Sequence, residues 1–103
     1  MANNKENLFV YGTLRDREIQ KSVFGRIAVL KPTVLEGYSK SEIVVDGMTY
    51  PALIPDKNNF VEGFVMSVTP KELELIDEYE TNAYRRVMVF LRSKQKAWVY
   101  IKA

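Results

Sequence analysis

The chain has 103 residues, of which 47% are hydrophobic and 27% are charged, and its formal net charge is +2. This length and balance are typical of one folded globular domain, so we expect residues 1–103 to form a single domain. The small charge favours neither nucleic acid nor an anionic membrane as a partner. Because Cys and His are absent, a disulfide framework, a Ser-His-Asp triad, a Cys nucleophile and a typical zinc site are excluded.

Residues 1–7 are polar and lack the apolar core of a signal peptide. No apolar run approaches the roughly 20 residues that span a bilayer. The carboxylates show no clustered spacing that would predict a metal site. We therefore expect a cytoplasmic protein with no metal, no cofactor and no membrane partner.

The first half of the chain predicts short strands and one weaker helix candidate. Residues 8–11 form an apolar run that stops at Gly12, which is typical of a buried strand entering a loop. The helix candidate covers residues 17–24, and residues 27–38 form an extended stretch that we expect to bend near Pro32. Asp46-Gly47 lies between the extended segments 42–45 and 48–50, and this dipeptide predicts a two-residue hairpin turn.

The second half predicts a turn at residues 56–59, a strand at 60–68 and one clear helix. Thr69 can cap that helix, Pro70 suits its first position and Glu72 completes a capping box, so the helix is predicted to run to about Glu80. Two further strands, 86–91 and 97–101, flank a turn near residues 93–95. The pattern predicts an α+β domain with a mostly antiparallel, barrel-like mixed sheet of five or six strands, one clear flanking helix and one doubtful one.

Helical periodicity distinguishes Glu80 from the other carboxylates of this helix. It falls on the face of Leu73 and Ile76, where Tyr79 is also expected, whereas Glu74 and Glu78 fall on the opposite face. An inward carboxylate in apolar surroundings has a raised pKa, which suits a general acid/base. The alternative is structural: Glu80 pairs with Arg85 or Arg86, or the helix ends early and leaves it in water.

The segment Val-Tyr-Gly-Thr-Leu-Arg at residues 10–15 is a second candidate site. Where a strand enters a Gly turn, backbone N–H groups lose their ladder partners and can bind a carboxylate or an oxyanion. The binding candidates are Tyr11, Gly12, Thr13 and Leu14, together with Tyr84, whose hydroxyl can face a pocket. The alternatives are an ordinary turn at a strand end and, for Tyr84, a residue at the edge of the core.

Two motifs together resemble a known family. Residues 9–15, Phe-Val-Tyr-Gly-Thr-Leu-Arg, and residues 75–80, Leu-Ile-Asp-Glu-Tyr-Glu, followed by Tyr-Arg-Arg-Val at 84–87, are similar in order and spacing to the gamma-glutamylcyclotransferase-like proteins. Tyr-Pro-Ala at 50–52 and Val-Glu-Gly-Phe-Val at 61–65 agree as well. The resemblance extends over nearly the whole chain, from about residue 8 to 100.

The resemblance implies a small β-barrel with flanking helices. It implies that Tyr11, Gly12, Thr13 and Leu14 form a substrate loop and that Glu80 is the catalytic acid/base. The implied reaction cyclises a γ-glutamyl amino acid or amine to 5-oxoproline and releases the amine. This reaction needs no protein nucleophile, metal or cofactor.

The chain departs from the family pattern in two places. Thr81 follows Glu80 where a small residue such as Gly is frequent, and the sequence stops after the last predicted strand where many relatives continue. Two other functions therefore stay open: a non-catalytic binding module for small molecules, and a structural or interaction domain. The sequence favours no particular leaving group and no oligomeric state.

Overall fold

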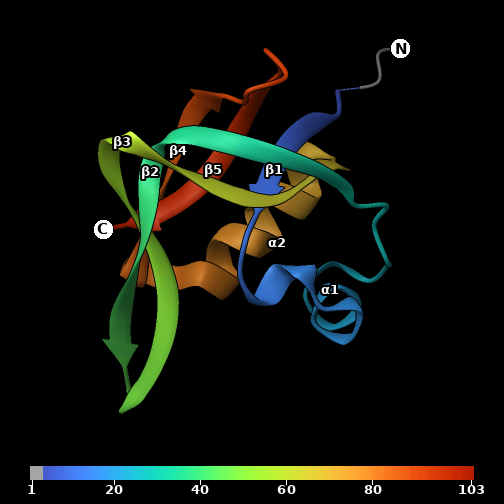
Figure 1. Cartoon of the computed structure of the whole chain (residues 1–103). Helices are drawn as coiled ribbons and strands as arrows, with labels where there is room; N and C mark the ends of the chain where they lie inside the picture. The colour runs from blue at the N-terminus through green and yellow to red at the C-terminus, as the bar shows by residue number, and fades with distance from the viewer. Residues whose placement is uncertain (1–3) are drawn as a thin grey trace.

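The computed structural model describes residues 4–103 as a five-stranded mixed sheet that curls into a half-barrel against two α-helices (Figure 1). The sheet order is β2-β3-β1-β5-β4, and every neighbouring pair is antiparallel except β1 and β5. The predicted α+β class and both predicted helices are thus confirmed. In chain order the elements are β1 (Glu6–Val10), the 3-10 helix η1 (Thr13–Arg15), α1 (Arg17–Phe24), β2 (Lys31–Val45), β3 (Met48–Val68), α2 (Pro70–Glu80), the 3-10 helix η2 (Thr81–Ala83), β4 (Tyr84–Phe90) and β5 (Lys96–Lys102).

Strands β2 and β3 form a long hairpin whose turned end projects from the body of the molecule (Figure 1). The turn is the predicted Asp46-Gly47, and both residues have positive φ, 52° and 79°. That geometry is what a two-residue hairpin turn requires and what Asp-Gly tolerates. The hairpin prediction is confirmed.

The turn predicted at residues 56–59 does not end a strand. Strand β3 continues through it, and the pairing with β2 passes from Tyr38 opposite Pro55 to Glu36 opposite Phe60. Four residues of β3 therefore lie opposite Gly37 alone, which has φ +91°. The polar turn residues form a bulge that bends one long strand.

The expected bend near Pro32 is also wrong, because Pro32 lies within regular pairing opposite Phe64. Residues 27–30 precede β2, which begins at Lys31. The irregularity in this strand lies at Gly37, where a positive φ is available without steric cost.

The half-barrel is drawn together at one end by Arg92, which follows β4. Its N–H donates to the Val34 carbonyl of β2 at 2.9 Å. Its guanidinium pairs with Glu36 at 3.0 Å and lies 5.3 Å from the centre of the Phe60 ring. The two edge strands of the sheet therefore meet through one residue at this end.

The core divides between the two faces of the sheet because side chains alternate along β1. Leu8 and Val10 belong to a cluster with residues of α1 and α2, whereas Phe9 and Tyr11 belong to a cluster inside the curl of the sheet. The second cluster also contains Leu35, Leu53, Val61, Val65, Leu91, Ala97, Val99 and Ile101. The central strand β1 thus fixes both halves of the core.

Helix α2 has the predicted capping box between Thr69 and Glu72, which also binds Arg26 at 2.6 Å. Leu73 and Ile76 are buried as expected. Tyr79 is 39% exposed, so its placement on the core-facing side was wrong. Among residues 4–103, no helix has the length and apolar character needed to cross a membrane, and no group of three or more acidic side chains is arranged to hold a metal ion.

Candidate functional site

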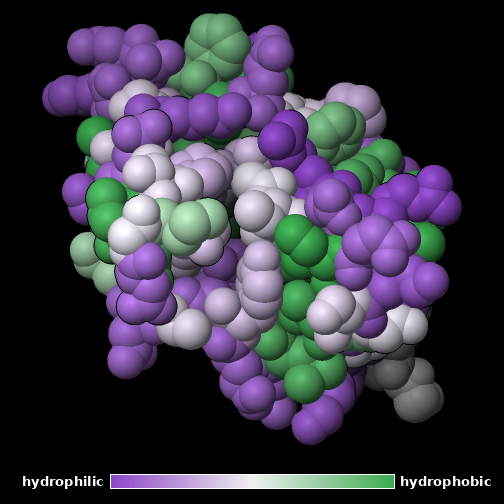
Figure 2. All heavy atoms as spheres, turned by 90° about the horizontal axis from the view of Figure 1, so that it is seen from below, coloured by the Kyte–Doolittle hydropathy of each residue, from purple (hydrophilic) through white to green (hydrophobic). Residues whose placement is uncertain are grey.

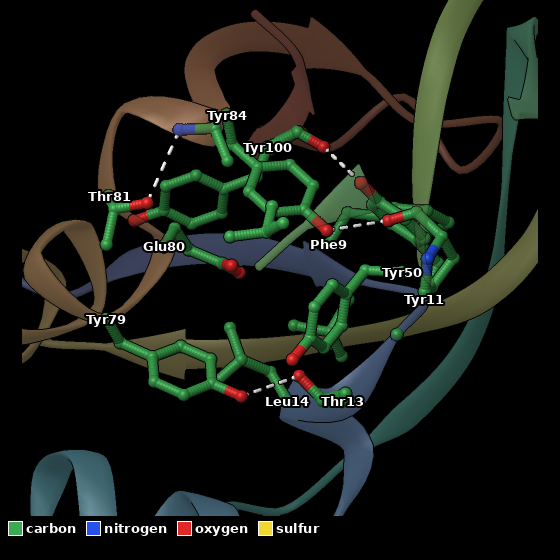
Figure 3. Close-up of a pocket in the computed structure, with 15 residues that line it drawn as sticks. Phe9, Tyr11, Thr13, Leu14, Tyr50, Tyr79, Glu80, Thr81, Tyr84 and Tyr100 are labelled. Carbon is green, nitrogen blue, oxygen red and sulfur yellow. Dashed lines mark hydrogen bonds between the residues drawn. The ribbon is translucent and has the colours of Figure 1, made fainter. Parts of the chain in front are cut away.

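The candidate site is a pocket of about 180 Å³ at the meeting point of β1, the β2–β3 hairpin, α2 and β5. Fifteen residues line it (Figure 3). Figure 2 views the molecule from below and shows a face that is hollowed near its centre, with hydrophilic side chains over much of its rim. A pocket of this kind, mostly apolar with a few polar groups, is typical of a small-molecule site.

Glu80, the last residue of α2, extends its carboxylate into this pocket (Figure 3). The carboxylate lies between the rings of Tyr84 and Tyr100 on one side and those of Tyr50 and Tyr79 on the other. Burial raises the pKa of this carboxyl group from 4.5 to about 7. A carboxylate with such a pKa can accept and return a proton near neutral pH.

Within residues 4–103 the Glu80 carboxylate forms no hydrogen bond and no ion pair with another residue. The structural alternative is not observed in residues 4–103: α2 continues to Glu80, neither Arg85 nor Arg86 pairs with it, and Arg86 instead donates to both oxygens of Asp77, at 2.9 and 3.0 Å. Glu80 is partly buried, and a carboxylate that loses part of its hydration without gaining a partner is costly unless it has a task. Glu80 is therefore the strongest candidate for chemistry in the pocket.

The loop after β1 lines the side of the pocket opposite Glu80, and hydrogen bonds outside the pocket fix its conformation. The Leu14 carbonyl accepts a hydrogen bond from the fully buried Gln20 side chain at 2.8 Å, and Gln20 also accepts from the Ala28 N–H. The Gly12 carbonyl accepts from both the backbone and the side chain of Arg15, at 3.1 Å each. In the described chain the N–H groups of residues 12–14 have no protein acceptor, so they can receive an anionic group.

Gly12 permits a close approach between the loop and β3. A Cβ atom at this position would lie 3.3 Å from the Pro51 ring. A larger residue would therefore push the loop and the hairpin apart and change the width of the pocket.

Buried and half-buried tyrosines give the pocket rigid walls. Tyr84 donates its hydroxyl to the Pro51 carbonyl at 2.7 Å, and Tyr11 donates to the Tyr100 carbonyl at 2.6 Å. Burial, with a smaller effect from nearby Glu80, raises the pKa of Tyr84 to about 12. Burial raises the pKa of Tyr11 still further. Both phenols therefore stay protonated and keep their acceptors near neutral pH.

A further contact links the loop to α2 at the exposed side of the pocket. The Thr13 and Tyr79 hydroxyls are 2.8 Å apart. This contact explains why Tyr79 faces outward from the core: its hydroxyl reaches the loop rather than packing beneath the helix.

All six sequence-predicted site residues line this one pocket. The sequence analysis did not predict Tyr50, Tyr79 or Tyr100 as site residues, although all three line the pocket. The agreement of Tyr50-Pro51-Ala52 with the family pattern could have predicted that Tyr50 and Pro51 line the pocket. The remaining lining residues are Phe9, Val10, Val45, Pro51, Thr81 and Ala83.

Thr81 ends α2 with φ 59° and ψ −162°, a conformation that is almost restricted to glycine. We expect Thr81→Gly to raise the unfolding free energy by about 1 kcal/mol, because relief of strain exceeds the added entropy of the unfolded chain. Thermal unfolding should show a melting temperature about 4 to 8 °C higher. Thr81→Ala is the control, since alanine keeps the Cβ and should show no gain. A lower melting temperature for the glycine variant would contradict this account.

Comparison with protein families agrees with the geometry of the site. The family model described as "Gamma-glutamyl cyclotransferase, AIG2-like" matches residues 8–103. The chain belongs to this family, as the two motifs predicted.

Curated relatives include AIG2-like protein B of Arabidopsis thaliana, 37% identical over 84 residues that cover 81% of this chain and 48% of the relative. A Methanocaldococcus jannaschii protein named as a gamma-glutamylcyclotransferase and putative RNase is 28% identical over 81 residues, covering 76% of this chain and 35% of that protein. The chain spans about half the length of the AIG2-like relatives that it matches.

Solved structures share the fold. The solution structure of an Arabidopsis thaliana protein has a TM-score of 0.83 at 28% identity, covering 99% of this chain and 71% of that one. A gamma-glutamyl cyclotransferase has a TM-score of 0.77 at 14% identity, covering 96% and 67%. At 14% identity the second match is evidence of a common architecture only.

Proposed function

We propose that the protein is a cyclotransferase that converts a γ-glutamyl amino acid or amine to 5-oxoproline and releases the amine. The observation that carries this proposal is the unpaired Glu80 carboxylate, which shares its pocket with the loop at residues 11–14. Burial raises the pKa of this carboxyl group to about 7. Membership of the gamma-glutamyl cyclotransferase family supports the reaction class.

In the proposed reaction the substrate's own α-amine attacks its γ-carbonyl carbon. A new C–N bond closes a five-membered ring, and the original amide C–N bond breaks. Glu80 accepts the proton that the attacking ammonium group loses and then donates it to the leaving nitrogen, so that protons balance. The free N–H groups at residues 12–14 can hold the substrate's α-carboxylate or the developing oxyanion.

The remaining contribution of the pocket is to hold the substrate in its ring-closing conformation. Rigid tyrosine walls limit the volume to about 180 Å³. Orientation of this kind can supply several kcal/mol of the barrier. The pocket then needs no protein nucleophile and no attacking water.

The charge of the pocket favours leaving groups without a carboxylate. Glu80 is the only formally charged side chain among the lining residues. Arg15 lines a different surface recess, and Arg86 is paired with Asp77. A second substrate carboxylate would therefore lie near Glu80 without a cationic partner, which is unfavourable.

We expect γ-glutamyl-alaninamide to be turned over with a kcat/KM about tenfold higher than γ-glutamyl-alanine, a difference of roughly 1.4 kcal/mol. These two substrates differ only in the carboxylate of the leaving group. The measurement is 5-oxoproline release as a function of substrate concentration. Equal values, or a preference for the free amino acid, would show that the charge of the pocket does not govern the leaving group.

The same assay tests the reaction itself, across a panel of γ-glutamyl amines and amino acids. Release of 5-oxoproline by the wild type supports the cyclotransferase. Binding of these compounds in calorimetry without release would instead favour the non-catalytic binding module. Neither binding nor release by a folded protein would overturn both functions.

A further inference from the structure

The helix that ends in Glu80 also carries Asp77, a carboxylate with no part in the proposed reaction. It lies one turn earlier on α2. The Arg86 guanidinium donates to its two oxygens at 2.9 and 3.0 Å, and the Tyr100 hydroxyl donates to one of them at 2.6 Å. Two charged residues of the motif at 75–80 and 84–87, Asp77 and Arg86, are therefore bonded to each other.

Arg86 is fixed on a second side by aromatic packing. Its guanidinium carbon lies 4.2 Å from the centre of the Trp98 ring. The Trp98 indole N–H in turn donates to the Glu6 carboxylate at 2.6 Å. A guanidinium bound in two fork-like hydrogen bonds and stacked on an indole has one preferred geometry. This network joins α2 to β4, β5 and β1.

The network lies behind the wall of the candidate pocket. The Tyr84 and Tyr100 side chains line that pocket and also line a separate surface recess that contains Asp77 and Arg86. Tyr100 is the direct link, because its hydroxyl binds Asp77 while its carbonyl accepts the Tyr11 hydroxyl from the loop side.

We propose that Asp77 and Arg86 are positioning residues that hold Tyr100 beside the Glu80 carboxylate and that neutralise each other's charge on the outer side of this wall. The effect that we expect on the reaction rate rests on the proposed cyclotransferase function. The effect that we expect on the pKa of Glu80 does not.

Removal of either partner is expected to shift the pKa of Glu80, and the direction differs between the two. An Asp77 carboxylate without Arg86 adds a negative charge one turn from Glu80, so Glu80 holds its proton more tightly. An Arg86 without Asp77 adds a positive charge, so Glu80 releases its proton more readily. Apart from Glu80, the titratable side chains that line the pocket are phenols: Tyr11 after β1, Tyr50 of β3, Tyr79 of α2, Tyr84 of β4 and Tyr100 of β5. The exposed Glu78 lines the recess on the other side of the wall, together with Asp77 and Arg86.

The test is a ¹³C NMR titration of the Glu80 side-chain carboxyl group in four proteins. We expect Arg86→Gln to raise its midpoint by about one pH unit and Asp77→Asn to lower it by a similar amount. The double variant should return to within a few tenths of a unit of the wild type. A purely structural role would not produce shifts of opposite sign, so equal signs or no shift would overturn the proposal.

Arg92→Gln is the matched control, because it also removes an Arg–carboxylate pair, with Glu36, but at the closed end of the half-barrel. Its Glu80 midpoint should equal that of the wild type. If Asp77→Asn fails to fold, the comparison of Arg86→Gln with Arg92→Gln still decides the outcome.

Kinetics supply the second part of the test. Tyr100→Phe and Asp77→Asn should lower kcat by about ten- to hundredfold with little change in KM, since a misplaced acid/base impairs the chemical step. The acidic limb of the pH–rate profile should move in the same direction as each NMR midpoint. Absence of turnover by the wild type would overturn the cyclotransferase, and the NMR titration would still support or overturn the role of Asp77 and Arg86.

Discussion

Glu80→Gln is expected to lower the rate of 5-oxoproline release by about 10²- to 10⁴-fold, the usual contribution of a general acid/base. Glutamine has the size of glutamate but cannot accept the ammonium proton, so KM should change little. The measurement is kcat and KM for a γ-glutamyl amine at pH 8, with circular dichroism to verify the fold. Rates that match the wild type would show that Glu80 is not the catalyst.

Glu78→Gln is the matched control for this variant. Glu78 is exposed on the same helix, two residues from Glu80, and its substitution should leave the rate unchanged. In the wild type, kcat/KM should rise as the pH increases through about 7, because burial raises the pKa of Glu80 to that value and the deprotonated form is the base. Glu78→Gln should show the same pH profile.

Gly63→Ala is expected to lower the free energy of unfolding by about 3 kcal/mol and the melting temperature by roughly 10 to 20 °C. A Cβ atom on Gly63 would lie 2.6 Å from the Val10 carbonyl oxygen and 2.7 Å from Cζ of Phe9. Neither neighbour can move easily: Val10 belongs to β1, and Phe9 is 1% exposed in the core. Chemical and thermal unfolding would measure the loss.

Gly12→Ala is the control for Gly63→Ala. Its nearest neighbour would be the Pro51 ring at 3.3 Å, with no backbone atom in conflict, so we expect a loss of about 1 kcal/mol or less. Comparable losses for the two variants would show that close contact with β1 is not what requires glycine at residue 63.

The features that the sequence predicted best are those that short segments determine. The capping box of α2 needs only Thr69 and Glu72, and the hairpin turn needs only Asp46-Gly47. Periodicity along one helix was likewise sufficient to separate Glu80 from Glu78. These features depend on residues within a few positions of one another, so the physical signal is present before any tertiary contact forms.

The features that were missed depend on distant partners. A polar tetrapeptide at residues 56–59 resembles a turn, but its pairing opposite Gly37 makes it a bulge inside β3. Tyr79 follows the apolar face of α2 by periodicity, yet its hydroxyl lies beside Thr13, 66 positions away. The arrangement of the strands decides whether Tyr79 packs in the core or bonds across the pocket. The sequence of a single segment carries no information on that arrangement.

The central place of β1 in the sheet has a consequence for how the protein folds. This first strand pairs with β3 and with β5, so Leu8 lies opposite Met66 on one side and opposite Trp98 on the other. Such distant pairings carry a large loop-closure cost and make folding slow relative to helical domains. During synthesis β1 emerges before the other four strands of this sheet, yet one of its edges has no partner until β5 follows. The unpaired backbone groups on that edge are then open to wrong pairing with another chain. Refolding of the chain should therefore be more prone to aggregation when β5 is weakened than when the exposed hairpin end is altered.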